Sequence, residues 1–332
     1  MKKASKKLNS FRLLRAYCAI IVLLSHIPCN NIISGAFGVS LFMMMSGFFA
    51  MYSTAQENNT YLLKKLAKII PLYWTVTIII SLTSMILPTV YNYTIPTFTN
   101  IIKSLVFIPY YIRDLNIYRP IFGSGWYLCI EFVFILIFSL FNKLKHSHRG
   151  LLASLTIITI YILGLVINNN LFKFYSSSYI LFYALGITFY YIYLYINKNN
   201  LHLKISITTI TKVIIFIFLL LISTIFSYKL PFFFINSLIL FLFILISPYQ
   251  NDNTIEKIGD ISFSLYMIHE FLIKGFSRVI YSLDKLTIIT ILMILILICI
   301  SILISKIIYE IYEKRIYNFI IKKSKVRKIK YE

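Results

Sequence analysis

The chain alternates between long apolar stretches and short polar connections. Most of the stretches are close to 20 residues, the length that an α-helix needs to cross the hydrocarbon core of a bilayer. This pattern predicts an all-α fold, a polytopic membrane protein built as a bundle of about ten transmembrane helices. The expected spans cover residues 11–28, 36–53, 69–88, 124–141, 151–168, 178–196, 207–227, 231–247, 261–281 and 286–309.

Composition favours a membrane protein over a soluble one. Hydrophobic residues make up 59% of the chain and charged residues only 13%. A large soluble protein with buried helices would need more charged side chains to cover its surface. We therefore expect residues 1–313 to form one transmembrane domain and residues 314–332 to form a basic cytoplasmic tail.

Positive charge is concentrated on one side of the predicted bundle. Most of the 33 Lys and Arg residues fall in the N-terminal segment, the tail and the connections that share their side. The positive-inside rule places this side, with both termini, in the cytoplasm of a multi-pass protein of the cell membrane. Topology and contact with anionic membrane lipid then explain the net charge of +22, and no nucleic-acid partner is needed. The tail is typical of an amphipathic segment that lies on the membrane surface.

The four cysteines, Cys18, Cys29, Cys129 and Cys299, show no spacing typical of metal ligands or redox pairs. Three of them lie within expected spans, where cysteine behaves as a small apolar residue. We therefore expect no metal site.

The first span, LLRAYCAIIVLLSHI at residues 13–27, contains both an arginine and a histidine. Arg15 and His26 are 11 positions apart, which places them on one helix face and roughly 16 Å apart along the axis. Ionisable groups at membrane depth normally face a bundle interior or an aqueous cavity. Two interpretations stay open: both residues line a functional site, or Arg15 snorkels to the inner interface while His26 is a polar cap among headgroups.

Five segments carry a resemblance to a known family. In chain order they are the Arg-x10-His pattern of LRAYCAIIVLLSH, then GVSLFMMMSGFF, KKLAKIIPLYW, WYLCIEFVFIL and IGDISFSLYMIHEFLI. Together they resemble the membrane acyltransferase-3 family, whose members O-acylate envelope polysaccharides and other extracytoplasmic acceptors. The resemblance implies transfer of an acyl group, usually acetyl from acetyl-CoA at the cytoplasmic side, to a hydroxyl of an extracytoplasmic cell-envelope saccharide.

The resemblance also implies roles for three residues within the spans. His26 would be the catalytic base or a transient acyl carrier, because an imidazole can take a hydroxyl proton at physiological pH. Glu131, which matches the glutamate of the family's W-x-x-x-x-E element, would orient His26 or bind an acceptor hydroxyl. Arg15 would hold donor oxygens through its forked guanidinium.

The donor side departs from the family pattern at two positions. Lys65 and Lys68 stand where relatives carry arginine, so donor phosphates would meet point charges in place of bidentate forks. The alternative is that both lysines only follow the positive-inside rule and do not bind the donor. Ser46 and Gly47 either permit close helix packing or leave room for the donor's pantetheine arm.

Two further groups are expected to bind the acceptor or support the site. Trp126 and Tyr127 open the fourth span at its outer end, where the tryptophan is either an interfacial belt residue or a platform for a sugar ring. Ser262, Tyr266 and His269 share one face of the ninth span. Structural hydrogen bonding between helices explains these three as well as chemistry does.

The expected partners follow from this interpretation. Acyl-CoA is the donor substrate, with no permanently bound cofactor, and an envelope polysaccharide or lipid-linked saccharide is the acceptor. Without an extracytoplasmic esterase-like domain, the chain either transfers directly or uses a separate extracytoplasmic transferase. A transporter or flippase for a lipid-linked saccharide or small solute is the main alternative, because an arginine and a histidine inside a bundle also suit a translocation pathway. A catalytically silent partner subunit is the third interpretation.

Overall fold

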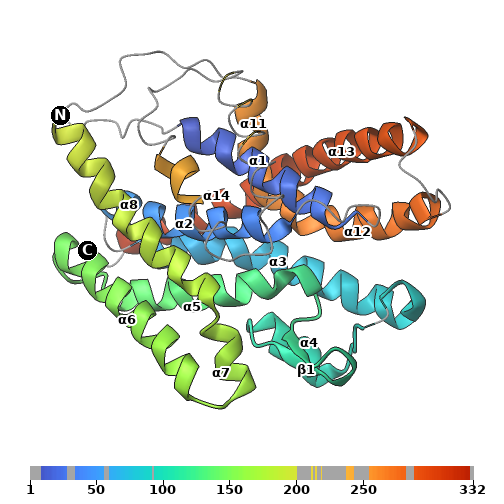
Figure 1. Cartoon of the computed structure of the whole chain (residues 1–332), viewed down its shortest axis with the longest axis horizontal. Helices are drawn as coiled ribbons and strands as arrows, with labels where there is room; N and C mark the ends of the chain where they lie inside the picture. The colour runs from blue at the N-terminus through green and yellow to red at the C-terminus, as the bar shows by residue number, and fades with distance from the viewer. Residues whose placement is uncertain are drawn as a thin grey trace. The chain divides into compact units, whose positions relative to one another are not determined.

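The computed structural model describes residues 9–27, 34–55, 60–91, 93–199, 211, 214, 218, 237–242, 254–281 and 288–329. Over these residues the chain is almost entirely helical, with one two-stranded sheet (Figure 1), which confirms the all-α fold class. The longer helices are α1 (Asn9–Ser25), α2 (Gly35–Thr54), α3 (Tyr61–Ile86), α5 (Trp126–Leu140), α6 (His146–Val166), α8 (Leu181–Lys198), α12 (Ser262–Tyr281), α13 (Ile288–Ile308) and α14 (Lys314–Ile329).

Eight of the ten expected spans coincide with a helix of this set. The other two, at 207–227 and 231–247, lie mostly outside the described residues. Within the described part, six segments are long and apolar enough to cross a membrane: Gly35–Thr54, Tyr61–Ile86, Gly123–Leu140, His146–Val166, Asn170–Lys198 and Ile289–Ser324. Ten spans are thus not confirmed. The two expected spans that fall short do so for different reasons: α1 has only 17 residues, and α12 contains three charged residues, Glu270, Lys274 and Arg278.

Apolar side chains cover the outer faces of several helices. On α13, Ile289, Leu292 and Ile296 are exposed by 59%, 53% and 52%, and their spacing places them on one face. A continuous exposed apolar face is costly in water and normal against lipid tails. This finding supports a multi-pass membrane protein on grounds other than composition.

By their contacts the helices form two compact units. The first contains residues 1–45 and 188–303, and the second contains residues 46–187 and 304–332.

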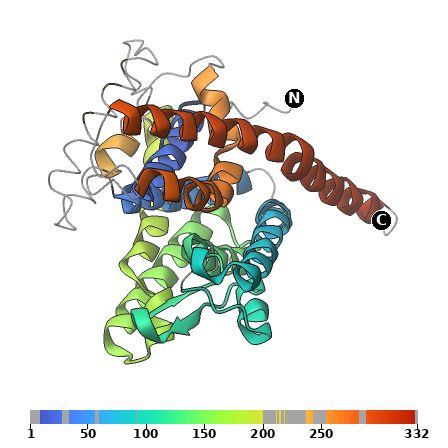
Figure 2. The ribbon, with the colours of Figure 1, turned by 90° about the vertical axis from the view of Figure 1, so that its right-hand side faces the viewer.

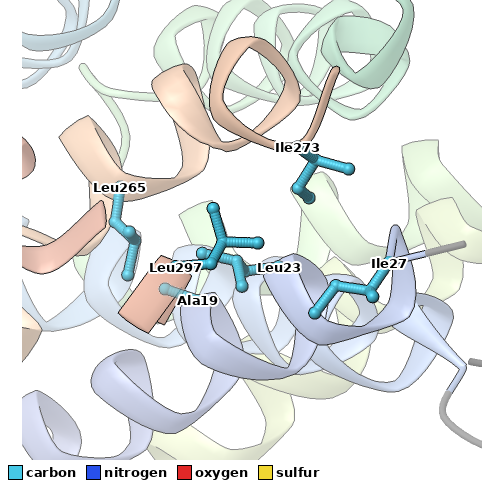
Figure 3. Packing of buried hydrophobic residues seen from close by; sticks show 6 residues of the cluster. All are labelled: Ala19, Leu23, Ile27, Leu265, Ile273 and Leu297. Atoms are coloured by element: carbon cyan, nitrogen blue, oxygen red, sulfur yellow. The ribbon is translucent and has the colours of Figure 1, made fainter. Parts of the chain in front are cut away.

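In the first unit, α1 packs against α12 and against the short helix α11 (Thr254–Asp260). Ala19, Leu23 and Ile27 recur every four residues and form one apolar face, which meets Leu265, Ile273 and Leu297 in a buried cluster (Figure 3). At the start of α1 the Arg12 guanidinium donates to both carboxylate oxygens of Asp260, at 3.0 and 2.5 Å.

In the second unit, the connection at 89–123, between the third and fourth expected spans, has structure of its own. It contains α4 (Phe98–Leu105) and the antiparallel strands β1 (Tyr110–Ile112) and β2 (Ile117–Arg119), drawn as arrows in Figure 2. The Tyr73 hydroxyl ties this piece to α3 by donating to the Ser104 carbonyl at 2.9 Å.

The expected tail begins as a continuation of α13. A π-helical turn at Tyr309–Glu313 leads directly into α14 (Figure 2). The hydroxyls of Tyr312 in this turn and Thr75 of α3 lie 2.6 Å apart, which fixes the turn against α3. The surface-lying role of the tail stays a prediction.

Candidate active site

The residues expected to act fall into two groups, one in each unit. The first unit contains Arg15, His26, Ser262, Tyr266 and His269, which we call the histidine group. The second contains Ser46, Gly47, Lys65, Lys68, Trp126, Tyr127 and Glu131, which we call the glutamate group.

His26 lies directly after the last residue of α1, with its side chain exposed. Its ring Nδ1 is 2.8 Å from the Val22 carbonyl oxygen and 3.2 Å from Ser25 Oγ. Because a carbonyl oxygen only accepts hydrogen bonds, Nδ1 carries a hydrogen in this contact. In the neutral form of the ring, the free lone pair is then on Nε2, where it can accept a proton from a hydroxyl.

His269 is the buried neighbour of His26. The two ring centroids are 4.8 Å apart, with the planes at 69°. His269 Nδ1 is 2.5 Å from the Tyr266 carbonyl oxygen, so this Nδ1 atom carries a hydrogen as well. Its Nε2 atom is buried and has no hydrogen-bond partner among the described residues. An unpaired buried acceptor of this kind costs about 1–3 kcal/mol, and a bound hydroxyl would remove that cost.

The other members of the histidine group support these rings to different degrees. Tyr266 is buried between Phe42 and His269, with ring centroids 6.4 and 5.4 Å away. Ser262 is buried at the first position of α12. Arg15 is half-buried on α1, 11 positions before His26.

Glu131 is the centre of the glutamate group and is 3% exposed. Its Oε1 atom accepts from Ser46 Oγ at 2.5 Å and from Lys65 Nζ at 3.2 Å. Its Oε2 atom accepts from the Tyr183 hydroxyl at 2.6 Å and from the Tyr127 hydroxyl at 3.4 Å. Lys65 Nζ also donates to Ser46 Oγ at 2.9 Å. Four donors therefore surround one carboxylate, which acts purely as an acceptor.

Helix geometry explains how these side chains meet. Tyr127 and Glu131 are four residues apart on α5, so they share a face. Gly47 lets α8 approach α2, since a Cβ atom at this position would overlap the Tyr183 carbonyl oxygen. Close packing against α8 therefore accounts for a glycine at position 47, and a role of Ser46 and Gly47 in leaving room for the donor stays a prediction.

Lys68 and Trp126 are the two remaining members of the glutamate group. Lys68 is half-buried on α3, about one turn after Lys65. Trp126 is half-buried, and its ring meets Tyr179 edge-on at 5.1 Å between centroids. A role of either residue in binding donor or acceptor stays a prediction.

Three residues that the structure links to these groups or to α1 were not among the candidates from the sequence. Asp260 pairs with Arg12, and its only signal was a lone acid directly before the ninth span. Tyr183 holds Glu131 but is one of 26 tyrosines, and nothing in the sequence distinguishes it. Tyr61 opens α3 with a buried hydroxyl that has no hydrogen-bond partner in the described part of the chain.

Comparison with protein families identifies the chain. A family model described as an acyltransferase domain, that of the acyltransferase-3 family, matches residues 8–310, a range that includes both groups. Comparisons with curated proteins and with solved structures returned no match. Because the family model covers most of the chain and the helices suit a membrane, the chain belongs to the acyltransferase-3 family and is a membrane acyltransferase.

Proposed function

We propose that the chain is an O-acyltransferase that moves acetyl or a similar small acyl group from cytoplasmic acyl-CoA to a hydroxyl of an extracytoplasmic cell-envelope saccharide. The observation that carries this proposal is the 2.8 Å contact between His26 Nδ1 and the Val22 carbonyl oxygen. The Nδ1 hydrogen is engaged by this carbonyl, which leaves Nε2 as a base beside the buried His269 ring.

The chemistry assigned to His26 is general-base catalysis. Nε2 accepts the proton of the acceptor hydroxyl while the hydroxyl oxygen attacks the acyl carbonyl carbon. The carbon–sulfur bond of the thioester breaks, and the proton ends on the thiol of CoA. His269 Nε2 serves as a second acceptor that orients the hydroxyl, because it lacks any other hydrogen-bond partner among the described residues.

The donor is assigned to the cationic residues of the inner side. These are two separate assignments. In the first unit, Arg15 would hold carbonyl or phosphate oxygens through its fork. In the second unit, Lys65 and Lys68 would supply positive charge from one face of α3. The acceptor is an envelope polysaccharide or a lipid-linked saccharide. Transfer is either direct or completed by a separate extracytoplasmic transferase.

Radiolabelled acetyl-CoA and purified protein in liposomes test this function. The enzyme hydrolyses or transfers the label, whereas a transporter or flippase leaves the donor intact. His26→Ala is expected to lower the rate by about 10²- to 10⁴-fold. His148→Ala, which removes an exposed imidazole on α6, is the matched control and keeps the rate. Equal rates for wild type and His26→Ala would refute the role of His26.

The acceptor is identified by comparing the envelope saccharide made with and without the gene. We expect a mass difference of one acyl group per modified sugar. Identical masses would exclude a saccharide acceptor while leaving the donor chemistry intact.

Cysteine labelling tests the proposed orientation in the cytoplasmic membrane. In a background with the four native cysteines replaced, a cysteine at Ser34 should react with an impermeant thiol reagent added outside. A cysteine at the exposed Ser147 should not. The reverse pattern would place both termini outside, against the charge bias that orients helices.

A further inference from the structure

Ser46 is a hydroxyl placed between a carboxylate and an ammonium group. Its Oγ atom donates to Glu131 Oε1 at 2.5 Å and accepts from Lys65 Nζ at 2.9 Å. A serine hydroxyl becomes a nucleophile when an adjacent base can take its proton. The combination of serine, lysine and glutamate also activates the nucleophile of class A β-lactamases, on an unrelated fold.

Other hydroxyls of the same helix differ from Ser46 in this respect. Ser53 Oγ donates to the Phe49 carbonyl at 2.6 Å, and Thr54 Oγ1 donates to the Ala50 carbonyl at 2.7 Å. These are the ordinary back-bonds of serine and threonine within a helix, and a carbonyl oxygen does not take the proton. Ser46 is instead turned toward a side-chain base.

A second observation points to a ligand at this place. Tyr61 lies one turn before Lys65 on α3 and is 4% exposed, yet its hydroxyl has no hydrogen-bond partner among the described residues. The Tyr61 ring packs against Phe138 of α5, the helix that also contains Glu131, with the ring centroids 5.0 Å apart. A buried donor without an acceptor suits an oxygen that develops negative charge during acyl transfer.

We infer that Ser46 Oγ is a nucleophile that receives the acyl group from the thioester donor and carries it as an ester. This inference rests on the proposed acyl-CoA-dependent transfer and replaces the direct attack of the acceptor on the thioester by two steps through a covalent intermediate. In the first step Oγ attacks the carbonyl carbon of the thioester, and its proton passes to Glu131 Oε1. The carbon–sulfur bond breaks, and the proton moves from Glu131 to the leaving sulfur, which gives acyl-Ser46 and the CoA thiol.

Lys65 and the two bound tyrosines have separate parts in this step. As the thioester enters, the Lys65 ammonium turns from the Oγ lone pair to the carbonyl oxygen, where Tyr61 is the other donor. Its side chain is 23% exposed, so it has room to move. Tyr183 and Tyr127 hold Oε2 and thereby keep Oε1 aimed at Ser46.

The second step regenerates the serine. The acceptor hydroxyl attacks the ester carbonyl, the bond from carbon to Ser46 Oγ breaks, and the acceptor's proton ends on Oγ. Without an acceptor saccharide this step is confined to slow attack by water, so the ester accumulates.

The test is acid-quenched labelling of the full chain in liposomes with radiolabelled acetyl-CoA and no acceptor. We expect label on the peptide that contains Ser46, as shown by mass spectrometry. Ser46→Ala should reduce labelling and transfer to background, whereas Ser53→Ala, in the same helix, should retain both. Ser46→Cys, which preserves the side-chain volume, should carry the label as a thioester that neutral hydroxylamine releases; the wild-type ester needs alkaline conditions.

The outcomes separate this inference from the proposed function. Wild-type protein that consumes acetyl-CoA without label on Ser46, or a Ser46→Ala variant that still transfers, overturns the nucleophile and leaves the acyltransferase intact. Label on His26 has the same meaning. Wild-type protein that consumes no acyl-CoA refutes the proposed donor, and the intermediate falls with it.

Discussion

The histidine group and the glutamate group hold their reactive atoms in different ways. In the histidine group, each ring is held by Nδ1 donating to a nearby backbone carbonyl, that of Val22 for His26 and that of Tyr266 for His269. In the glutamate group, one carboxylate is held by side chains from α2, α3, α5 and α8. The first arrangement is local and pairs two imidazole rings, and the second is long-range and contains opposite charges.

This difference predicts which substitutions reduce both stability and catalysis and which reduce catalysis alone. A side chain that only presents a lone pair can be removed without opening a helix interface. A carboxylate that satisfies four donors from four helices cannot, because its loss leaves buried polar atoms unpaired. Substitutions in the glutamate group should therefore reduce stability and catalysis together, and substitution of His26 should reduce catalysis alone.

Glu131→Gln is expected to have the largest effect on stability. The substitution removes the negative charge opposite Lys65 and presents an amide hydrogen to groups that are themselves donors. Breaking a buried pair costs about 3–5 kcal/mol, and we expect the lower end because the Lys65 side chain is 23% exposed. Thermal unfolding in detergent measures the loss. Unfolding at the wild-type temperature would mean that the carboxylate does not stabilise the four helices.

Tyr183→Phe and Tyr127→Phe rank the two phenols that bind the same oxygen. The Tyr183 hydroxyl is 2.6 Å from Glu131 Oε2, and the Tyr127 hydroxyl is 3.4 Å away. A hydrogen bond to a charged group contributes about 1.5–3 kcal/mol, and we assign this value to Tyr183. Tyr127→Phe is the matched control with a smaller loss, because hydrogen bonds weaken with distance. Equal losses would show that the two phenols share the carboxylate evenly.

Lys65→Arg and Lys68→Arg test which lysine is confined by the glutamate group. Lys65 Nζ donates to both Ser46 and Glu131, and the planar guanidinium of arginine differs in size and geometry from the ammonium group that makes these two contacts. We expect Lys65→Arg to cost about 1 kcal/mol, the lower end of overpacking, and to lower the transfer rate. Lys68→Arg should leave both unchanged. The test compares the unfolding temperatures and transfer rates of the two variants. A Lys65→Arg variant with wild-type stability and rate would show that the glutamate group does not confine this side chain.

Part of this architecture could be predicted from the sequence, because the signals are local. Apolar stretches near 20 residues located eight helices, and the i, i+4, i+7 spacing placed His269 on the face with Tyr266. Burial of Glu131 followed from its position in an apolar span. These signals depend on the helix period or on hydropathy, which a single segment contains.

The long-range parts could not be predicted in the same way. Ser46, Lys65 and Glu131 meet because three helices pack, and the residues are up to 85 positions apart in the chain. Tyr183 enters because Gly47 permits close contact with α8. A small residue in a span indicates close packing without naming the partner helix. The hairpin β1–β2 was missed for another reason, since each strand has only three residues.

His26→Ala should have the smallest effect on stability and still remove transfer, and it is the sharpest test of the contrast. The ring is exposed and follows the last residue of α1, so its removal opens no core. Such surface substitutions change stability by less than about 0.5 kcal/mol. The lost hydrogen bond to the Val22 carbonyl leaves a helix-end carbonyl that Ser25 Oγ already satisfies at 2.7 Å. Unfolding of wild type and variant should therefore coincide, while acyl transfer fails. A His26→Ala variant that unfolds as early as Glu131→Gln would make the histidine group a structural element, and the division of labour between the two groups would be wrong.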